Sequence, residues 1–190
     1  MERIGIFVGS FDPFTIGHDS IVRRALPLFD RLVIGVGVNE KKHYMLTAEE
    51  RVETIRGLYD GEKKISVEQY SDLTVDFAQR HGAQFIVKGV RSVKDFEFER
   101  EQADINRRLT GIETVVFYAL PGMDSVSSTV VRELKNFGRS VDSFLPKKNL
   151  TRWCDGEMLT LVHISQQHIS TPHHLYTTTP QHNDITTSRI

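Results

Sequence analysis

The sequence predicts an α/β protein with a Rossmann-like, doubly wound sheet of five parallel strands and helices on both faces. Short runs of β-branched and aromatic residues alternate along the chain with segments whose apolar residues recur at helical spacing. Strands that are separated by helices pair in parallel, and the crossovers are right-handed. Ligands of such sheets bind at the carboxyl ends of the strands, so the functional residues are expected there.

Composition describes an ordinary globular chain of 190 residues, 39% of them hydrophobic and 26% charged, which suffices for one domain with a sizeable core. The net charge of −1 gives no overall attraction to nucleic acid or to a membrane surface, so neither is expected as a partner. A single cysteine excludes an intrachain disulfide and favours a cytoplasmic location. No signal peptide is visible, and no apolar run reaches the ~18 residues of a membrane span.

The first element is a strand over Ile4–Val8, which Gly9 interrupts before Asp12-Pro13 makes a turn. From Gly17-His18 onward the apolar residues follow helical spacing. The unpaired N–H groups and the dipole of a helix N-terminus attract phosphate. This strand, loop and helix therefore predict a nucleotide site with His18 beside the bound anion.

The middle of the chain predicts two further strands and two helices. The strands are expected at Arg31–Val38 and Ile65–Gln69. Thr47 and Glu50 form a capping box for a helix that ends near Leu58. A shorter helix is expected from Thr74, as its N-cap, through Arg80.

Two more strands and two helices complete the domain. The fourth strand is expected at Gln84–Lys88, with Gly89 ending it, and a charged helix follows over Lys94–Leu109. The fifth strand is expected at Thr114–Leu120, and the last helix at Ser127–Phe137.

The segment from residue 148 to residue 190 differs from the domain predicted for residues 1–147. It is polar, rich in threonine and holds five of the eight histidines, so we expect a weakly ordered appendage. The spacing of its histidines matches no standard pattern of metal ligands, and no protein-bound metal is expected.

Two segments together resemble the signature of the class I nucleotidylyltransferases. Gly9–His18 is similar to the half of the signature whose T-x-G-H turn binds a nucleotide triphosphate, and Val126–Arg132 is similar to the I-S-S-S/T-x-x-R half. Either half alone is a weak signal, whereas both halves on a five-strand α/β pattern are a strong one.

Further segments resemble the bacterial phosphopantetheine adenylyltransferase family over about residues 1–147. Val87–Glu99, Lys41-Lys42 and Leu46–Arg51 carry this likeness. It implies transfer of the adenylyl group of ATP to 4′-phosphopantetheine, giving dephospho-coenzyme A and pyrophosphate. The attacking phosphate oxygen is already ionised at neutral pH, so positioning and charge neutralisation can suffice without a general base.

The resemblance implies a role for each site residue. His18 would stabilise the transition state at the α-phosphate, Lys42 would neutralise the acceptor phosphate, and Arg91 would bind the phosphates of ATP. The implied ATP contacts are Ser10, Phe11, His18, Gly89, Val90, Arg91, Glu99, Ser127, Ser128 and Thr129, and the implied acceptor contacts are Ser10, Lys42, Thr74 and Lys88.

The sequence departs from the family pattern at two positions. Lys88 stands where the family has arginine, which keeps the charge but loses the bidentate fork. Phe98 replaces the usual tyrosine and so lacks its hydroxyl.

The resemblance also implies a homohexamer, coenzyme A as a feedback ligand, and Mg²⁺ held by the ATP phosphates. A nicotinate- or nicotinamide-mononucleotide adenylyltransferase shares both signature halves and stays an alternative. A cytidylyltransferase is less favoured because its R-T-x-G-I-S pattern is absent. A non-catalytic nucleotide-binding module is a further alternative.

Overall fold

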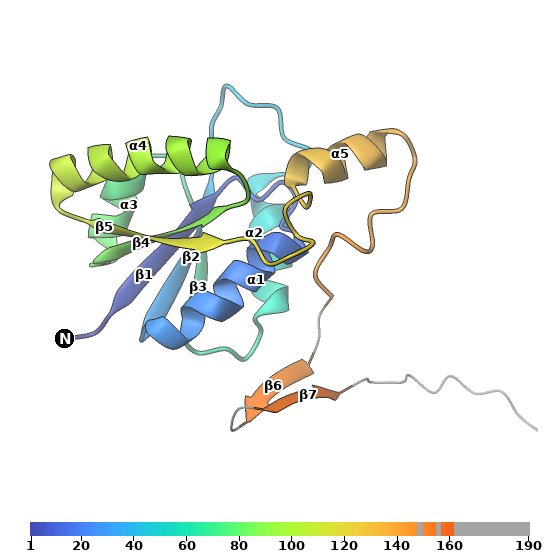
Figure 1. The fold of residues 1–190 in the computed structure, drawn as a ribbon, viewed down its shortest axis with the longest axis horizontal. Coiled ribbons are helices and arrows are strands. Elements are labelled where there is room, and N and C mark those ends of the chain that lie inside the picture. Colours follow the sequence, from blue (N-terminus) through green and yellow to red (C-terminus); the bar gives the residue numbers. More distant parts are fainter. Residues whose placement is uncertain (148–149, 155–156, 162–190) are drawn as a thin grey trace, which may run out of the picture. The chain divides into compact units, whose positions relative to one another are not determined.

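A computed structural model describes residues 1–147, 150–154 and 157–161. Within them, five parallel strands form one sheet in the order β3-β2-β1-β4-β5 (Figure 1). The strands are β1 (Ile4–Gly9), β2 (Arg31–Gly37), β3 (Ile65–Tyr70), β4 (Phe85–Val90) and β5 (Glu113–Tyr118). The predicted doubly wound sheet is confirmed. Its strand order reverses between β1 and β4, which is where such sheets open a ligand crevice.

Helices cover both faces of the sheet (Figure 1). They are α1 (Ile16–Ala25), α2 (Ala48–Leu58), α3 (Thr74–Arg80), α4 (Val93–Thr110) and α5 (Ser128–Asn136), with a short 3₁₀ turn, η1, at Leu26–Leu28. Helices α1 and α2 pack on one face and α3 on the other, and α4 contacts β4, β5 and α3.

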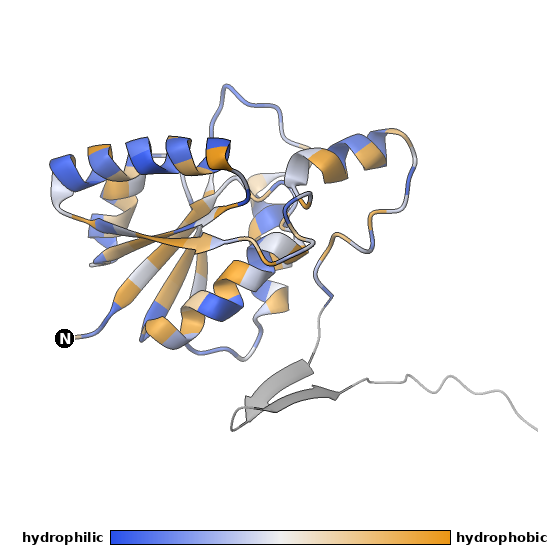
Figure 2. Cartoon of the chain, viewed as in Figure 1, coloured by the Kyte–Doolittle hydropathy of each residue, from blue (hydrophilic) through white to orange (hydrophobic). Residues whose placement is uncertain are grey.

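The core consists of two apolar clusters, one on each face of the sheet. Neighbouring residues of β1 point to opposite faces, so Phe7 joins the cluster of α1 and α2 while Ile6 joins that of α3. Phe77 of α3 is fully buried, as is Ile55 of α2. The central strands β1 and β2 are accordingly apolar and buried along nearly their whole length, as expected for strands that are covered on both faces (Figure 2).

Of the two helix N-caps predicted from the sequence, that of α2 is confirmed and that of α3 is wrong. Thr47 and Glu50 form the capping box of α2, with Glu50 N–H donating to Thr47 Oγ1 (3.1 Å) and Thr47 N–H to Glu50 Oε2 (2.8 Å). The prediction for Thr74 is wrong, because Leu73 is the N-cap of α3 and Thr74 is its first helical residue. The Thr74 hydroxyl instead lies 3.3 Å from the hydroxyl of Tyr70, the last residue of β3, and does not cap the helix.

Gly89 does not end β4, contrary to the sequence prediction, because the strand continues to Val90. A Cβ atom at position 89 would overlap Cδ1 of Ile21. The glycine therefore leaves room for the side chain of Ile21 between α1 and β4, a contact that the local sequence does not reveal.

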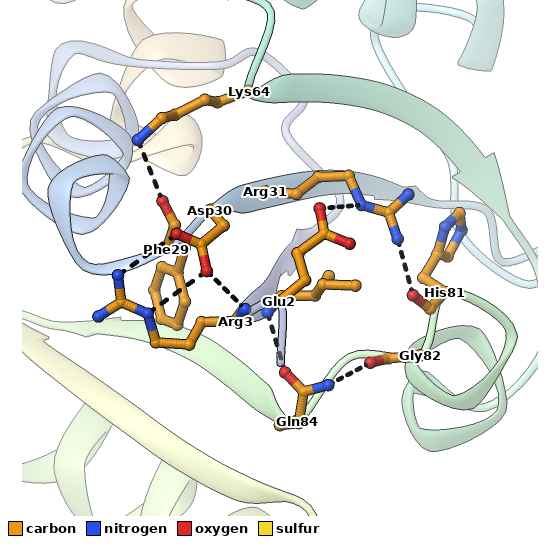
Figure 3. A network of polar contacts seen from close by, with 10 residues as sticks. Glu2, Arg3, Phe29, Asp30, Arg31, Lys64, His81, Gly82 and Gln84 are labelled. Atoms are coloured by element: carbon orange, nitrogen blue, oxygen red, sulfur yellow. Dashed lines mark hydrogen bonds and ion pairs between the residues drawn. The ribbon is translucent and has the colours of Figure 1, made fainter.

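Ion pairs and hydrogen bonds close the edge of the sheet where the strands begin (Figure 3). Asp30 accepts a hydrogen bond from the Arg3 N–H (2.8 Å) and pairs with its guanidinium (3.4 Å), and these contacts lower the pKa of Asp30. Gln84 accepts from Ile4 N–H (2.9 Å), and Arg31 donates to the His81 carbonyl (3.0 Å). The charged groups at this edge thus join the strand starts to one another.

The chain divides into two compact units, Met1–Asn149 and Leu150–Ile190. In the second unit, β6 (Leu150–Cys154) and β7 (Glu157–Leu161) form an antiparallel pair that the sequence analysis does not anticipate. The rest of the predicted appendage, with its five histidines, lies outside the described residues. In the described part of the chain, no helix combines the length and apolar character of a membrane span.

Candidate active site

A cleft of about 460 Å³ opens at the reversal point of the sheet, where β1 and β4 end. Loops and helix ends from four segments that are far apart in the sequence line it. Twelve of the thirteen residues assigned to the site from the sequence lie in its wall: Ser10, Phe11, His18, Lys42, Lys88, Gly89, Val90, Arg91, Glu99, Ser127, Ser128 and Thr129. Thr74 is not among its lining residues.

His18 lies in the first turn of α1 and is held by the residue that begins the helix. The N–H of Thr15 donates a hydrogen bond to His18 Nδ1 (2.9 Å), and the Thr15 hydroxyl lies 3.0 Å from the same atom. A nitrogen that accepts an N–H bond cannot carry a proton, so the neutral imidazole carries its proton on Nε2. His18 thereby becomes a hydrogen-bond donor through Nε2.

The surroundings of His18 keep its ring neutral. Desolvation in the cleft, with a smaller contribution from the positive charge of Arg91, lowers the pKa of His18 from 6.5 to about 4. The rings of Phe11 and Phe14 lie 5.1 and 5.3 Å from the imidazole, centroid to centroid. Phe11 adopts a φ of 49°, in the left-handed region that non-glycine residues rarely occupy. That backbone conformation places a buried ring against His18.

Arg91, at the end of β4, is fixed by two neighbouring segments. Its Nε donates to Asp95 Oδ2 (3.0 Å), and one terminal nitrogen lies 3.4 Å from the carbonyl oxygen of Val126. The same Asp95 oxygen accepts the N–H of Arg91 (3.2 Å). The guanidinium is thus oriented before a ligand binds, which lowers the entropic cost of binding.

Lys88 and Glu99 form an ion pair within the cleft wall. The ammonium of Lys88 lies 3.1 Å from Glu99 Oε2, and the two side chains are 20% and 17% exposed. The sequence assigned these residues to different substrates, and the structure brings them into contact. Phe98, from the same turn of α4 as Glu99, also lines the cleft.

The N-terminus of α5 points its unpaired N–H groups toward the cleft. Ser127 is the N-cap, and its hydroxyl accepts the N–H of Val130 (3.2 Å). Ser128 donates its hydroxyl to the Pro13 carbonyl (2.8 Å), so this side chain joins α5 to the loop after β1. The N–H groups of Ser128 and Thr129 precede the first intrahelical bond and form a site for an anion.

Three residues join the loops around the cleft: Asp12 and Arg51, to which the sequence assigned no site role, and Arg132, the last residue of the second signature half. Asp12 was interpreted only as part of a turn, yet its buried carboxylate accepts the N–H groups of Met45 (2.8 Å) and Leu46 (2.9 Å). Arg51 was assigned no role, yet it is 1% exposed and donates to three backbone carbonyls. Arg132 donates to the Asp12 carbonyl (2.6 Å). All three lie in segments that carry the family resemblance, so the motifs pointed to these positions but not to the partners they bind.

Comparison with known proteins matches residues 6–134 to the cytidylyltransferase-like family. The fold and the cleft therefore define a nucleotidyltransferase. The chain is 52% identical over 145 residues to the phosphopantetheine adenylyltransferase of Bacteroides fragilis, covering 76% of this chain and 97% of the relative. That of Porphyromonas gingivalis strain ATCC 33277 is 47% identical over 146 residues, covering 77% and 95%. The chain belongs to the phosphopantetheine adenylyltransferase family of enzymes.

Two solved structures share the fold at low identity. A putative nicotinate-nucleotide adenylyltransferase from Vibrio parahaemolyticus superposes with a TM-score of 0.54 at 19% identity, covering 77% of this chain and 95% of that one. A bifunctional NMN adenylyltransferase/ADP-ribose pyrophosphatase from Francisella tularensis gives 0.57 at 15% identity, and this chain spans 45% of its length and 76% of its own. These likenesses support the nucleotidylyltransferase fold.

Proposed function

We propose that the chain transfers the adenylyl group of ATP to 4′-phosphopantetheine, giving dephospho-coenzyme A and pyrophosphate, a step of coenzyme A biosynthesis. An oxygen of the acceptor phosphate attacks the α-phosphorus in line, forming one P–O bond while the P–O bond to pyrophosphate breaks. The observation that carries this proposal is His18, a neutral histidine with its proton on Nε2, in a cleft lined by Lys42 and Arg91.

His18 would act as a hydrogen-bond donor rather than as a base. Its Nε2–H would donate to an α-phosphate oxygen, and that bond strengthens as charge accumulates in the transition state. The contact between Thr15 N–H and Nδ1 orients the ring in advance. Because the acceptor is already ionised, no proton has to be removed from it.

The cations of the cleft would divide the phosphate charge between them. Lys42 is exposed at its mouth and would meet the acceptor phosphate together with Ser10. Lys88 would approach the acceptor as well, with Glu99 holding its ammonium and facing ATP. Arg91 would bind the triphosphate alongside the backbone of Phe11, Gly89 and Val90. This division leaves the acceptor phosphate and the α-phosphate close enough to react.

Pyrophosphate would leave toward the N-terminus of α5. The N–H groups of Ser128 and Thr129 are oriented there by the Ser127 cap, so they meet the developing charge without reorganising.

Mg²⁺ would accompany ATP, neutralising charge on its phosphates. Both carboxylates that line the cleft, Asp95 and Glu99, are ion-paired with Arg91 and Lys88. Among the described residues, no group of three His, Cys, Asp or Glu side chains gathers to hold a metal. The donor set therefore fits an ion that takes its ligands from the phosphates and water.

We also propose that the chain forms a homohexamer, that coenzyme A binds the acceptor half of the cleft as a feedback ligand, and that the enzyme is cytoplasmic. Helix α4 buries none of its 18 residues fully, and it exposes apolar side chains such as Val93, Ile105 and Leu109. In the described part of the sheet, β5 pairs with β4 alone and leaves its other edge open. These surfaces suit contacts between copies of the chain.

The decisive experiment measures pyrophosphate release from ATP and Mg²⁺ with 4′-phosphopantetheine, beside nicotinate and nicotinamide mononucleotide. We expect turnover with 4′-phosphopantetheine alone. His18→Ala should lose about 10²-fold or more in kcat, the scale of deleting one transition-state donor. Turnover with a mononucleotide would assign the chain to the rival transferases. ATP binding without turnover on any acceptor would instead support a non-catalytic module.

A further inference from the structure

We propose that Asp12 and Arg51 are positioning residues that hold Lys42 at the mouth of the cleft. This inference rests on the proposed function, in which Lys42 meets the acceptor phosphate. Lys42 lies in the segment between β2 and α2, residues 38–46, which we name the Lys42 loop. Residues 40–43 of this loop are all exposed, so buried apolar contacts do not fix their position.

Asp12 fixes the end of the Lys42 loop nearest α2. Its two carboxylate oxygens accept separate backbone bonds, one from Met45 N–H (2.8 Å) and one from Leu46 N–H (2.9 Å). The side chain is 2% exposed, so these bonds form away from competing water. A carboxylate that accepts backbone N–H groups makes bonds about twice as strong as those of a neutral acceptor.

Arg51 joins both ends of the Lys42 loop to the loop after β1. Its guanidinium donates to the carbonyls of Ser10 (2.6 Å), Gly37 (3.1 Å) and Thr47 (3.2 Å). Gly37 ends β2 and Thr47 caps α2, so the two residues that bracket the loop share one buried cation. The carbonyl of Ser10, which is also proposed to meet the acceptor, is held by the same group.

A chain of contacts leads from Arg51 to Lys42 itself. The guanidinium lies 4.2 Å from the centre of the Tyr44 ring. The Tyr44 hydroxyl accepts the N–H of Asn39 (3.0 Å), and the Asn39 carbonyl accepts the N–H of Lys42 (2.9 Å). The backbone of Lys42 is thus linked through Asn39 and Tyr44 to the fully buried side chain of Arg51.

Burying a charge is costly unless its hydrogen bonds are satisfied. Asp12 is satisfied by two N–H groups of the Lys42 loop, and Arg51 by the carbonyls of Ser10 and of the two residues that flank the loop. Two buried charged side chains, Asp12 and Arg51, therefore help to position one exposed ammonium group, that of Lys42. Such preorganisation increases affinity for the group that the ammonium meets.

The test is a double-mutant cycle between Asp12→Asn and Lys42→Ala, with KM measured for 4′-phosphopantetheine and for ATP. Asn retains the size of Asp but faces one backbone N–H with an NH₂ group. We expect Asp12→Asn to raise the acceptor KM about tenfold, the loss of one charge-assisted bond. Asp12→Asn should change the KM for ATP by less than about twofold. The double variant should have an acceptor KM within about twofold of that of Lys42→Ala alone, because Asp12 acts through Lys42.

Asp30→Asn is the matched control, because Asp30 also accepts a backbone N–H but lies where the strands begin. It should lower stability without changing the acceptor KM. An Asp12→Asn effect that is equally large in the Lys42→Ala background, or equally large for ATP, would overturn the proposal. If wild type turns over a mononucleotide instead, the proposed function fails. The same double-mutant cycle, measured with that mononucleotide as the acceptor, still tests the positioning role.

A second measurement does not depend on turnover. Trypsin cleaves after Lys41 and Lys42, and a held loop resists it until it opens locally. Asp12→Asn and Arg51→Lys should be cut there several-fold faster than wild type and Asp30→Asn, with the cleavage site identified by mass spectrometry. Equal rates at this site in all four proteins would contradict the inference.

Discussion

At the scale of the residue, His18 acquires its chemical character from its four neighbours Thr15, Phe11, Phe14 and Arg91. Thr15 N–H determines which nitrogen carries the proton, and two aromatic rings and Arg91 keep the imidazole neutral. A bound triphosphate opposes the effect of Arg91, because a nearby anion favours the protonated ring.

The depressed pKa of His18 predicts how stability depends on pH. The unfolded chain binds a proton at His18 below about pH 6.5, whereas the folded chain does so only near pH 4, so stability falls as pH drops between these values. The loss attributable to this group is at most about 3 kcal/mol. Urea unfolding of wild type and His18→Asn across pH 7.5 to 4 measures it as the difference between the two proteins. A difference that does not change with pH would contradict the assigned ionisation.

At the scale of the element, the site depends on how closely α1 approaches β4. Gly89 admits the side chain of Ile21, and this packing places the first turn of α1, with His18, beside the end of β4, with Arg91. The missing Cβ atom thus accommodates a close contact between α1 and β4, the two elements that carry His18 and Arg91, 73 positions apart.

Gly89→Ala should destabilise the protein by about 1–3 kcal/mol, the usual cost of overpacking a tight interface. The added Cβ overlaps Cδ1 of Ile21, which Ile21→Val removes. The double variant should therefore be more stable than Gly89→Ala alone, although Ile21→Val by itself destabilises. Denaturant unfolding of the four proteins measures the coupling, and simple additivity would rule out this contact as the reason for the glycine.

At the scale of the whole molecule, the proposed homohexamer can be tested at the exposed apolar residues of α4. Leu109 and Ile105 are 64% and 49% exposed on it. Leu109→Glu combined with Ile105→Glu should lower the mass measured by light scattering from that of a hexamer, because each charge would have to be desolvated at the interface. Leu28→Glu, at an exposed leucine of η1, is the control and should leave the mass unchanged. A wild-type monomer would refute the hexamer directly.

The catalytic domain should work without the second unit. Among the described residues, those that line the cleft all lie between positions 7 and 132, and the Phe144 carbonyl accepts the N–H of Ile16 at the start of α1 (2.9 Å). A chain that ends at Lys147 retains all of these groups. We expect its kcat/KM with 4′-phosphopantetheine to lie within about twofold of the full-length value, as for a distant independent change. A larger loss would assign the residues after Lys147 a part in catalysis.

Some features of this protein follow from the sequence alone, because they depend on neighbours along the chain. Strand and helix periodicity predicts the five-strand sheet, and the spacing of Thr47 and Glu50 predicts the start of α2. The carboxyl ends of parallel strands share one edge, so the sequence also indicates that residues around His18 and Arg91 meet.

Other features depend on contacts between segments that are distant in the sequence, and only the tertiary structure decides them. The sequence predicts Asp12 to be a turn residue, whereas in the structure its carboxylate binds the Lys42 loop. It predicts Gly89 to end a strand, whereas in the structure Gly89 makes room for Ile21. Thr74 reads as a cap, although the Tyr70 hydroxyl occupies its side chain. A sequence specifies which groups are available, whereas burial and the partner across the fold determine what each group does.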